Sequence, residues 1–282
     1  MSARRSRFVV TAVALVALLA GGAFVLDWLA GDGRGGRGPA VGAAPPAPGD
    51  EAGRAGGVRF RERATAAPAP SRSKNGTVLS LPGDFPIEGP GTFTYAEGES
   101  EELGESGPVR RFRLGVEDGV DEDLTGLAGF VDDTLGAEQG WTAGQDLRLQ
   151  RVPDGAGHDF TIYLATSATT ARMCAEVGVD VIGAGLPEGG VSCRGPGQVI
   201  LNFSRWRLSV PQFVDAGVAL STYRQMLVNH EVGHELGYGH EACPDPGEPA
   251  PVMQQQTVEL AGCEPNPWPY LDGRRYTGPP TP

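Results

Sequence analysis

Residues 230–240 contain three histidines and a glutamate at a spacing that would suit the binding of one metal ion and the activation of a water molecule. The chain reads His230-Glu231-Val232-Gly233-His234-Glu235-Leu236-Gly237-Tyr238-Gly239-His240. His230 and His234 are four residues apart, so on a helix both imidazoles would face one side and could bind a single Zn²⁺ at about 2.0–2.1 Å. Glu231 would lie beside them, where its carboxylate could act as general base toward an attacking water.

A third ligand depends on the glycine within this pattern. Gly237 can adopt the left-handed conformation that ends a helix, and the turn would carry His240 back toward the same metal. Three neutral imidazoles leave one tetrahedral position of zinc open, which is typical of catalytic rather than structural sites. We therefore expect a catalytic zinc site. Two other interpretations stay open: histidines that merely pack or lie exposed, and a zinc site without hydrolytic activity.

The same residues carry a resemblance to a known clan of enzymes. They match H-E-x-x-H-x-x-G-x-x-H at every fixed position, and this pattern resembles the signature of metzincin zinc peptidases, which continues with a methionine turn. Met253 stands 13 residues after His240 in a Pro-rich loop and fits that place. The resemblance implies that Met253 forms an apolar floor under the ligands and that the reaction is peptide-bond hydrolysis.

A narrower resemblance links the chain to an uncharacterised family of exported zincin-like domains from actinobacteria. It covers about residues 86–268 and implies a zincin-type fold without a known substrate. Glu241 follows the third histidine as in astacins, but Gln255 stands where astacins carry a further tyrosine ligand, which indicates a separate subgroup. The segments that carry the similarity are Gly140-Trp141-Thr142, Leu201-Asn202-Phe203-Ser204-Arg205-Trp206, Tyr223-Arg224-Gln225 with Asn229-His230-Glu231, residues 249–257, and Pro265-Asn266-Pro267-Trp268.

The elements that must position these residues follow an α+β pattern. Apolar alternation predicts strands at 110–116, 147–152, 160–164 and 198–203. Helical periodicity predicts helices at 121–135 and 219–236, with a doubtful short helix at 167–174 and an irregular Pro-rich tail. We expect a single α+β domain with a mixed, twisted sheet. The resemblance adds a zincin-like (metzincin) fold with an active-site helix and a Met-turn, and substrate addition at an edge strand near 198–203.

Several side chains near the motif have no assigned role. The group that stabilises the oxyanion is open, and Tyr223, Tyr238 and Asn202 are candidates only by their closeness in the chain. Glu235 could support a metal ligand, but we favour an exposed carboxylate on the helix surface. His158 is the only histidine outside the motif and lies in a turn-like stretch, so we interpret it as a solvated loop residue.

The four cysteines allow three disulfide pairings. No two cysteines stand in a C-x-x-C spacing that would favour a metal site. Export would make disulfides the expected state. We favour Cys174 with Cys193 and Cys243 with Cys263, since each pair closes a local loop, and the second would brace the loop that bears Met253. Free buried thiols remain the alternative.

The N-terminal part predicts a membrane segment. Arg4, Arg5 and Arg7 precede an uncharged run of 19 residues at 8–26, and at about 1.5 Å per residue such a helix nearly spans a hydrocarbon core of about 30 Å. The arginines would stay in the cytoplasm and the rest would be exported. We assign residues 1–30 to a signal-anchor, favoured over a cleaved signal peptide, residues 31–76 to a Gly/Ala/Pro-rich unstructured linker, and residues 77–282 to the metallopeptidase domain.

Composition restricts the partners. The 282-residue chain has a net charge of −12, which argues against nucleic-acid binding. We expect a membrane-tethered, monomeric, extracytoplasmic zinc metallopeptidase that acts on a peptide or protein in the cell envelope or outside. The alternatives are a non-catalytic, zinc-stabilised envelope-binding module and a zinc hydrolase of another amide, such as one in the cell wall.

Overall fold

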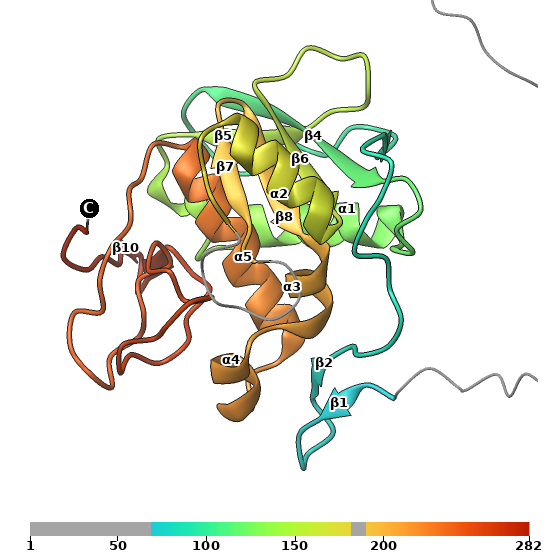
Figure 1. The fold of residues 1–282 in the computed structure, drawn as a ribbon. Coiled ribbons are helices and arrows are strands. Elements are labelled where there is room, and N and C mark those ends of the chain that lie inside the picture. The colour runs from blue at the N-terminus through green and yellow to red at the C-terminus, as the bar shows by residue number, and fades with distance from the viewer. Residues whose placement is uncertain (1–68, 182–189, 282) are drawn as a thin grey trace, which may run out of the picture. The chain divides into compact units, whose positions relative to one another are not determined.

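The computed structural model describes residues 69–181 and 190–281, which belong to one compact unit (Figure 1). The membrane segment expected at 1–30 and most of the linker expected at 31–76 lie outside the described residues. Within the described residues, no helix is long and apolar enough to cross a membrane.

A mixed β-sheet forms the centre of the domain, as the sequence predicts. Its strand order is β3-β4-β6-β8-β7. A further strand, β5, pairs with the first part of β4, whereas β3 pairs with the last part of β4. β4, β5, β6 and β8 run parallel, while β3 and β7 run antiparallel to their neighbours. The strands are β3 (Phe93–Tyr95), β4 (Val109–Glu117), β5 (Arg148–Arg151), β6 (Phe160–Ala165), β7 (Cys193–Gly195) and β8 (Gln198–Asn202).

Helices cover both faces of this sheet (Figure 1). Successive side chains of a strand point to opposite faces. Val199 and Leu201 of β8 are fully buried in the main core, which contains residues of α1 and α5, whereas Ile200 packs with Cys174 of α2 in a second cluster. The helices are α1 (Leu124–Leu135), α2 (Ser167–Glu176), α3 (Phe203–Leu208), α4 (Pro211–Asp215) and α5 (Leu220–Glu235), with a 3₁₀ turn at Trp141–Gly144.

The predicted helices at 121–135 and 219–236 correspond to α1 and α5, and the doubtful helix at 167–174 is α2. α1 begins three residues later than predicted because Asp123 caps it, accepting a hydrogen bond from the Thr125 N–H at 3.1 Å. Two small antiparallel pairs complete the described structure: β1 (Ser71–Arg72) with β2 (Val78–Ser80), and β9 (Tyr270–Leu271) with β10 (Arg274–Arg275). Between residues 236 and 281 no helix follows α5.

The expectation that the strand near 198–203 lies at the sheet edge is wrong. This strand is β8, which pairs with β6 on one side and with β7 on the other. β7 is the end strand of the sheet. A two-residue turn, Pro196-Gly197, folds β7 back on β8, and Gly197 adopts φ +71° there. The three residues of β7 are too few to show apolar alternation, so the pattern could not predict them.

The cysteines pair as favoured from the sequence. Cys174 of α2 is bonded to Cys193 of the edge strand β7, and Cys243 is bonded to Cys263. Loops of 19 and 20 residues are closed in this way, and a crosslink over such a loop contributes about 3 kcal/mol to stability. Disulfides suggest an extracytoplasmic domain, because they persist in oxidising compartments.

Candidate metal centre

The three histidines of the motif converge on one point. His230 and His234 lie one turn apart on α5, with their Nε2 atoms 3.2 Å apart. His240 brings its Nε2 atom to 3.1 Å from that of His234, and the ligand atoms of all three lie within 4.8 Å of one another. Two nitrogens bound to one tetrahedral zinc are about 3.4 Å apart. The group could therefore hold a metal ion.

Gly237 makes this convergence possible. α5 ends at Glu235, and Gly237 adopts φ +100°, a left-handed conformation. The Tyr238 N–H donates to the Gly233 carbonyl at 3.0 Å and the Gly237 N–H to the His234 carbonyl at 3.1 Å. These two bonds define a Schellman ending, which reverses the chain within two residues. The third histidine is thus returned to the other two without a second helix.

Backbone carbonyls orient two of the rings. The Nδ1 atom of His230 lies 2.8 Å from the Val252 carbonyl oxygen, and that of His234 lies 2.9 Å from the Tyr238 carbonyl oxygen. Each Nδ1–H then donates, which leaves the Nε2 lone pair free to bind a metal. Burial lowers the pKa of His230 to about 3, and burial also lowers the pKa of His234 and of His240. At neutral pH all three imidazoles are therefore uncharged, which is the state that metal binding requires.

Glu231 lies beside the ligands and lines the same cleft. Its side chain is buried, with 5% of the residue exposed, and this burial raises the pKa of its carboxyl to about 8. A cation on the three imidazoles would oppose this effect by favouring the carboxylate. Glu231 therefore adds a buried carboxyl group to the cleft that the three histidines line.

Met253 packs against α5 at Gly233. It is fully buried, and a Cβ atom at Gly233 would lie only 2.4 Å from the Met253 sulfur and 2.6 Å from Cζ2 of Trp141. Trp141 is fixed in turn, since its Nε1–H donates to the Asn229 carbonyl at 2.8 Å. Glycine at position 233 therefore lets the side chains of Met253 and Trp141 approach the backbone of α5 this closely.

We expect Gly233→Ala to destabilise the domain. Overpacking a core costs about 1–3 kcal/mol, which exceeds the gain of about 1 kcal/mol that alanine brings to a helix. The methyl group would also push Met253 away from the ligands, so zinc affinity should fall as well. Thermal unfolding and zinc competition would measure both effects. Gly129→Ala, on the exposed side of α1 where a Cβ meets nothing within 4 Å, is the matched control and should stabilise.

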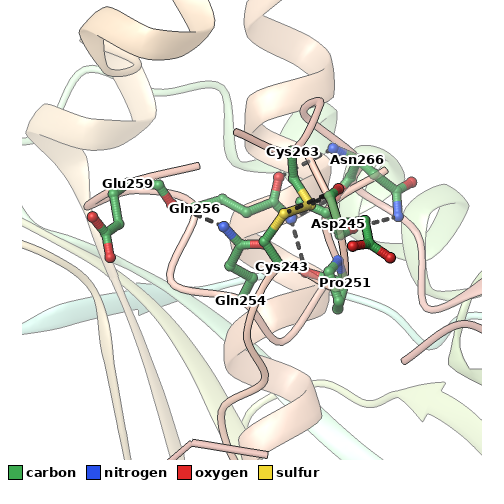
Figure 2. The surroundings of a disulfide bond; sticks show 9 residues. Cys243, Asp245, Pro251, Gln254, Gln256, Glu259, Cys263 and Asn266 are labelled. Carbon is green, nitrogen blue, oxygen red and sulfur yellow. Dashed lines mark hydrogen bonds between the residues drawn. A yellow bond between two sulfur atoms is a disulfide. The ribbon is translucent and has the colours of Figure 1, made fainter. Parts of the chain in front are cut away.

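Hydrogen bonds and a disulfide hold the loop that follows Pro251 in place (Figure 2). The Gln256 amide donates to the carbonyls of Pro251 at 3.2 Å and Asn266 at 2.7 Å, and its oxygen accepts the Asn266 N–H at 3.1 Å. The Cys243–Cys263 disulfide closes the same region covalently. The irregular loop thus has a fixed shape, although neither helix nor strand supports it.

A cleft of about 750 Å³ opens above the histidines. One wall is the edge strand β7 with the residues before it, another is α5, and the third is the loop after Met253. Three large apolar side chains are exposed in the described part of the chain, Ile87, Val179 and Val258, and the last two line this cleft.

Of the three oxyanion candidates, only Tyr238 lines the cleft, where its ring stacks on Trp141 with a centroid distance of 4.5 Å. Tyr223 is fully buried and its hydroxyl lies 3.1 Å from Thr257 Oγ1; burial raises the pKa of its phenol. Asn202 is also fully buried and caps α3 by accepting the Ser204 N–H at 2.9 Å. These two residues have structural positions.

The interpretation of Glu235 as an exposed carboxylate is wrong. Only 8% of the residue is exposed. Its Oε1 accepts from Arg110 of β4 at 2.9 Å, and its Oε2 accepts from Arg194 Nε of β7 at 2.9 Å and from the Gly197 N–H at 3.3 Å. Glu235 therefore ties the end of the ligand-bearing helix to the edge strand. Residues distant in sequence bury it, so local periodicity could not predict this contact.

His158 is exposed, as expected, with its Nδ1 atom 3.0 Å from the Ala156 carbonyl oxygen. It lies in a different part of the fold from the three motif histidines, which are the one group of metal-ligating side chains found among the described residues.

Comparison with known proteins gives one match. Residues 80–271, more than half of the chain, match the family described as protein of unknown function (DUF3152). The comparison with curated proteins found no significant match, and neither did the comparison with solved structures. The matched region contains the sheet from β3 to β8, the helix α5, the three histidines and Met253. The chain therefore belongs to the DUF3152 family.

Proposed function

We propose that this protein is a zinc-dependent metallopeptidase with a zincin-like fold. The observation that carries the proposal is the convergence of three neutral imidazoles, with Glu231 beside them, at the base of an open cleft. Structural zinc sites use four protein ligands, whereas three ligands and an adjacent carboxylate are typical of hydrolytic sites. The Met253 floor and the Gly237 turn support the metzincin resemblance.

The residues of the chain divide the chemistry between them. A zinc ion held by the three histidines would polarise the scissile carbonyl and make water nucleophilic near neutral pH. The Glu231 carboxylate would accept a proton from the attacking water and then donate it to the leaving amine nitrogen. We assign the hydrogen bond to the oxyanion to Tyr238, since it is the one of the three candidates that lines the cleft.

The edge strand β7 supports an extended peptide as the substrate. Cys193 and Arg194 line the cleft, and among the described residues β7 pairs on one side only, with β8. A peptide can add to such an edge through main-chain hydrogen bonds, while its side chains enter neighbouring pockets. The exposed Val179 and Val258 favour apolar side chains in these places.

We place this activity outside the cytoplasm, tethered by the segment at 1–30, with zinc as the cofactor and an envelope or extracellular peptide as the substrate. The two disulfides and the apolar run at 8–26 support this location.

The test uses the full chain, purified in a mild detergent. Metal content is measured by plasma mass spectrometry, and hydrolysis of a peptide library and of cell-wall fragments is followed in parallel by mass spectrometry. We expect about one zinc per chain, as for other three-histidine sites, and peptide cleavage that stops on chelation and returns with zinc. Cleavage of wall fragments alone would support another amide hydrolase, and zinc without any hydrolysis would support a binding module.

A further inference from the structure

The third histidine is held differently from the other two. His230 and His234 lie on α5 and each has its Nδ1 atom within hydrogen-bond distance of a backbone carbonyl oxygen. The ring of His240 is partly exposed, and its Nδ1 atom makes no such bond with any described residue. Its position must therefore come from the backbone that carries it.

That backbone lies between two other segments. On one side the Glu241 N–H donates to the Met253 carbonyl at 3.1 Å. On the other side the Ala242 N–H donates to the Pro279 carbonyl at 2.7 Å, and the Thr281 N–H donates to the carbonyl of His240 itself at 3.0 Å. Glu241 and Pro280 thereby form an antiparallel bridge. We call residues 275–281 the tail segment.

Side chains of the tail segment reinforce this pairing. Arg275 donates to Glu241 Oε1 at 3.1 Å, and both side chains are largely shielded, with 16% and 13% exposed. The same guanidinium lies 5.0 Å from the ring centroid of Trp141 and 5.2 Å from that of Tyr238. Such contacts with aromatic rings are favourable when they are shielded from solvent.

The fit of the tail segment against the third ligand is also close. A Cβ atom at Gly278 would lie 1.9 Å from the Ala242 carbonyl oxygen, so only glycine permits this approach. The tail segment thus contacts residues 240–242 through backbone hydrogen bonds, an ion pair and a close steric fit.

From these contacts we propose that the tail segment is a positioning element for His240 and that full metal affinity depends on it. The inference rests on the proposed metal site. The tail segment lies outside residues 80–271, the part that matches the family, so part of the support of the third ligand comes from residues that the family match does not include. Groups that hold a ligand in place typically contribute about 10–100-fold to metal affinity.

The test compares zinc affinity among variants of the full chain by competition with a chromogenic chelator. Arg275→Gln removes the ion pair with Glu241, a chain ending at Pro279 loses the Thr281 N–H, and a chain ending at Tyr276 loses both backbone bonds. We expect affinity to fall by about tenfold in the first two and more in the third. Arg274→Gln, at an exposed neighbour, is the control and should not change it.

Cobalt substitution adds a readout that general destabilisation does not move, since the visible spectrum of Co²⁺ reports the number of ligands. The variants should lose intensity in this spectrum while their circular dichroism stays that of the wild type. In a His240→Ala background the truncations should weaken zinc binding no further, because the tail segment acts through that residue.

Wild-type affinity and spectrum in all three variants would overturn the inference and leave the proposed function intact. If the shortest chain does not fold, Arg275→Gln and the chain ending at Pro279 decide. A wild-type chain that binds no zinc would overturn the proposed function and this inference together.

Discussion

Glu231→Gln is expected to abolish hydrolysis and to leave zinc binding nearly unchanged. The amide keeps the size of the carboxyl group but cannot accept the proton of the attacking water, and loss of a general base costs about 10²–10⁴-fold in rate. Stability should not fall, because a buried neutral amide replaces a carboxyl whose pKa burial raises to about 8.

The measurement is kcat/KM on a peptide selected from the library, with zinc content determined on the same preparation. Glu248→Gln changes an exposed carboxylate outside the cleft and serves as the matched control. Full activity in Glu231→Gln would remove this residue from the mechanism, and loss of zinc together with activity would make its role structural.

His234→Ala is expected to remove the metal. His234 is the central ligand, since its Nε2 atom lies 3.2 Å from that of His230 and 3.1 Å from that of His240. The two remaining imidazoles cannot complete a three-ligand site. A ligand present at about 1,000 times its dissociation constant stabilises the folded state by about 4 kcal/mol. The free energy of unfolding of the wild type should therefore fall by about this amount when a chelator removes the metal.

The expected loss of metal in His234→Ala would be tested by measuring its zinc content and its unfolding temperature with and without a chelator. His234→Ala should unfold at the same temperature in both conditions, whereas His158→Ala, which changes the one histidine outside the motif, should respond like the wild type. Stoichiometric zinc in His234→Ala would place the metal elsewhere.

The parts of the site that follow from local geometry could be predicted from the sequence. The spacing of His230 and His234 depends only on the pitch of a helix, and the turn that leads the chain back toward His240 depends on one left-handed glycine. The α+β class also follows, because β4, β6 and α5 are long enough to show their periods.

The parts that depend on long-range pairing could not be predicted. To predict that β7 lies at the edge of the sheet, one would have to know that its three residues fold back on β8. The burial of Glu235 requires Arg110 and Arg194 from two other strands. The contacts of Arg275 with Glu241 and of Thr281 with His240 join residues that no motif connects.

The attachments of β7 affect how the cleft would receive a substrate. One end of this strand is bonded covalently to α2 through Cys193, and Arg194 and Gly197 are joined to the ligand-bearing helix through Glu235. The distance between β7, the proposed peptide-binding edge, and the three histidines is therefore set before any substrate arrives. Such preorganisation removes the entropic cost of ordering this edge, so the cost that remains is that of ordering the peptide. Peptides already held extended should accordingly bind more tightly than flexible peptides of the same composition.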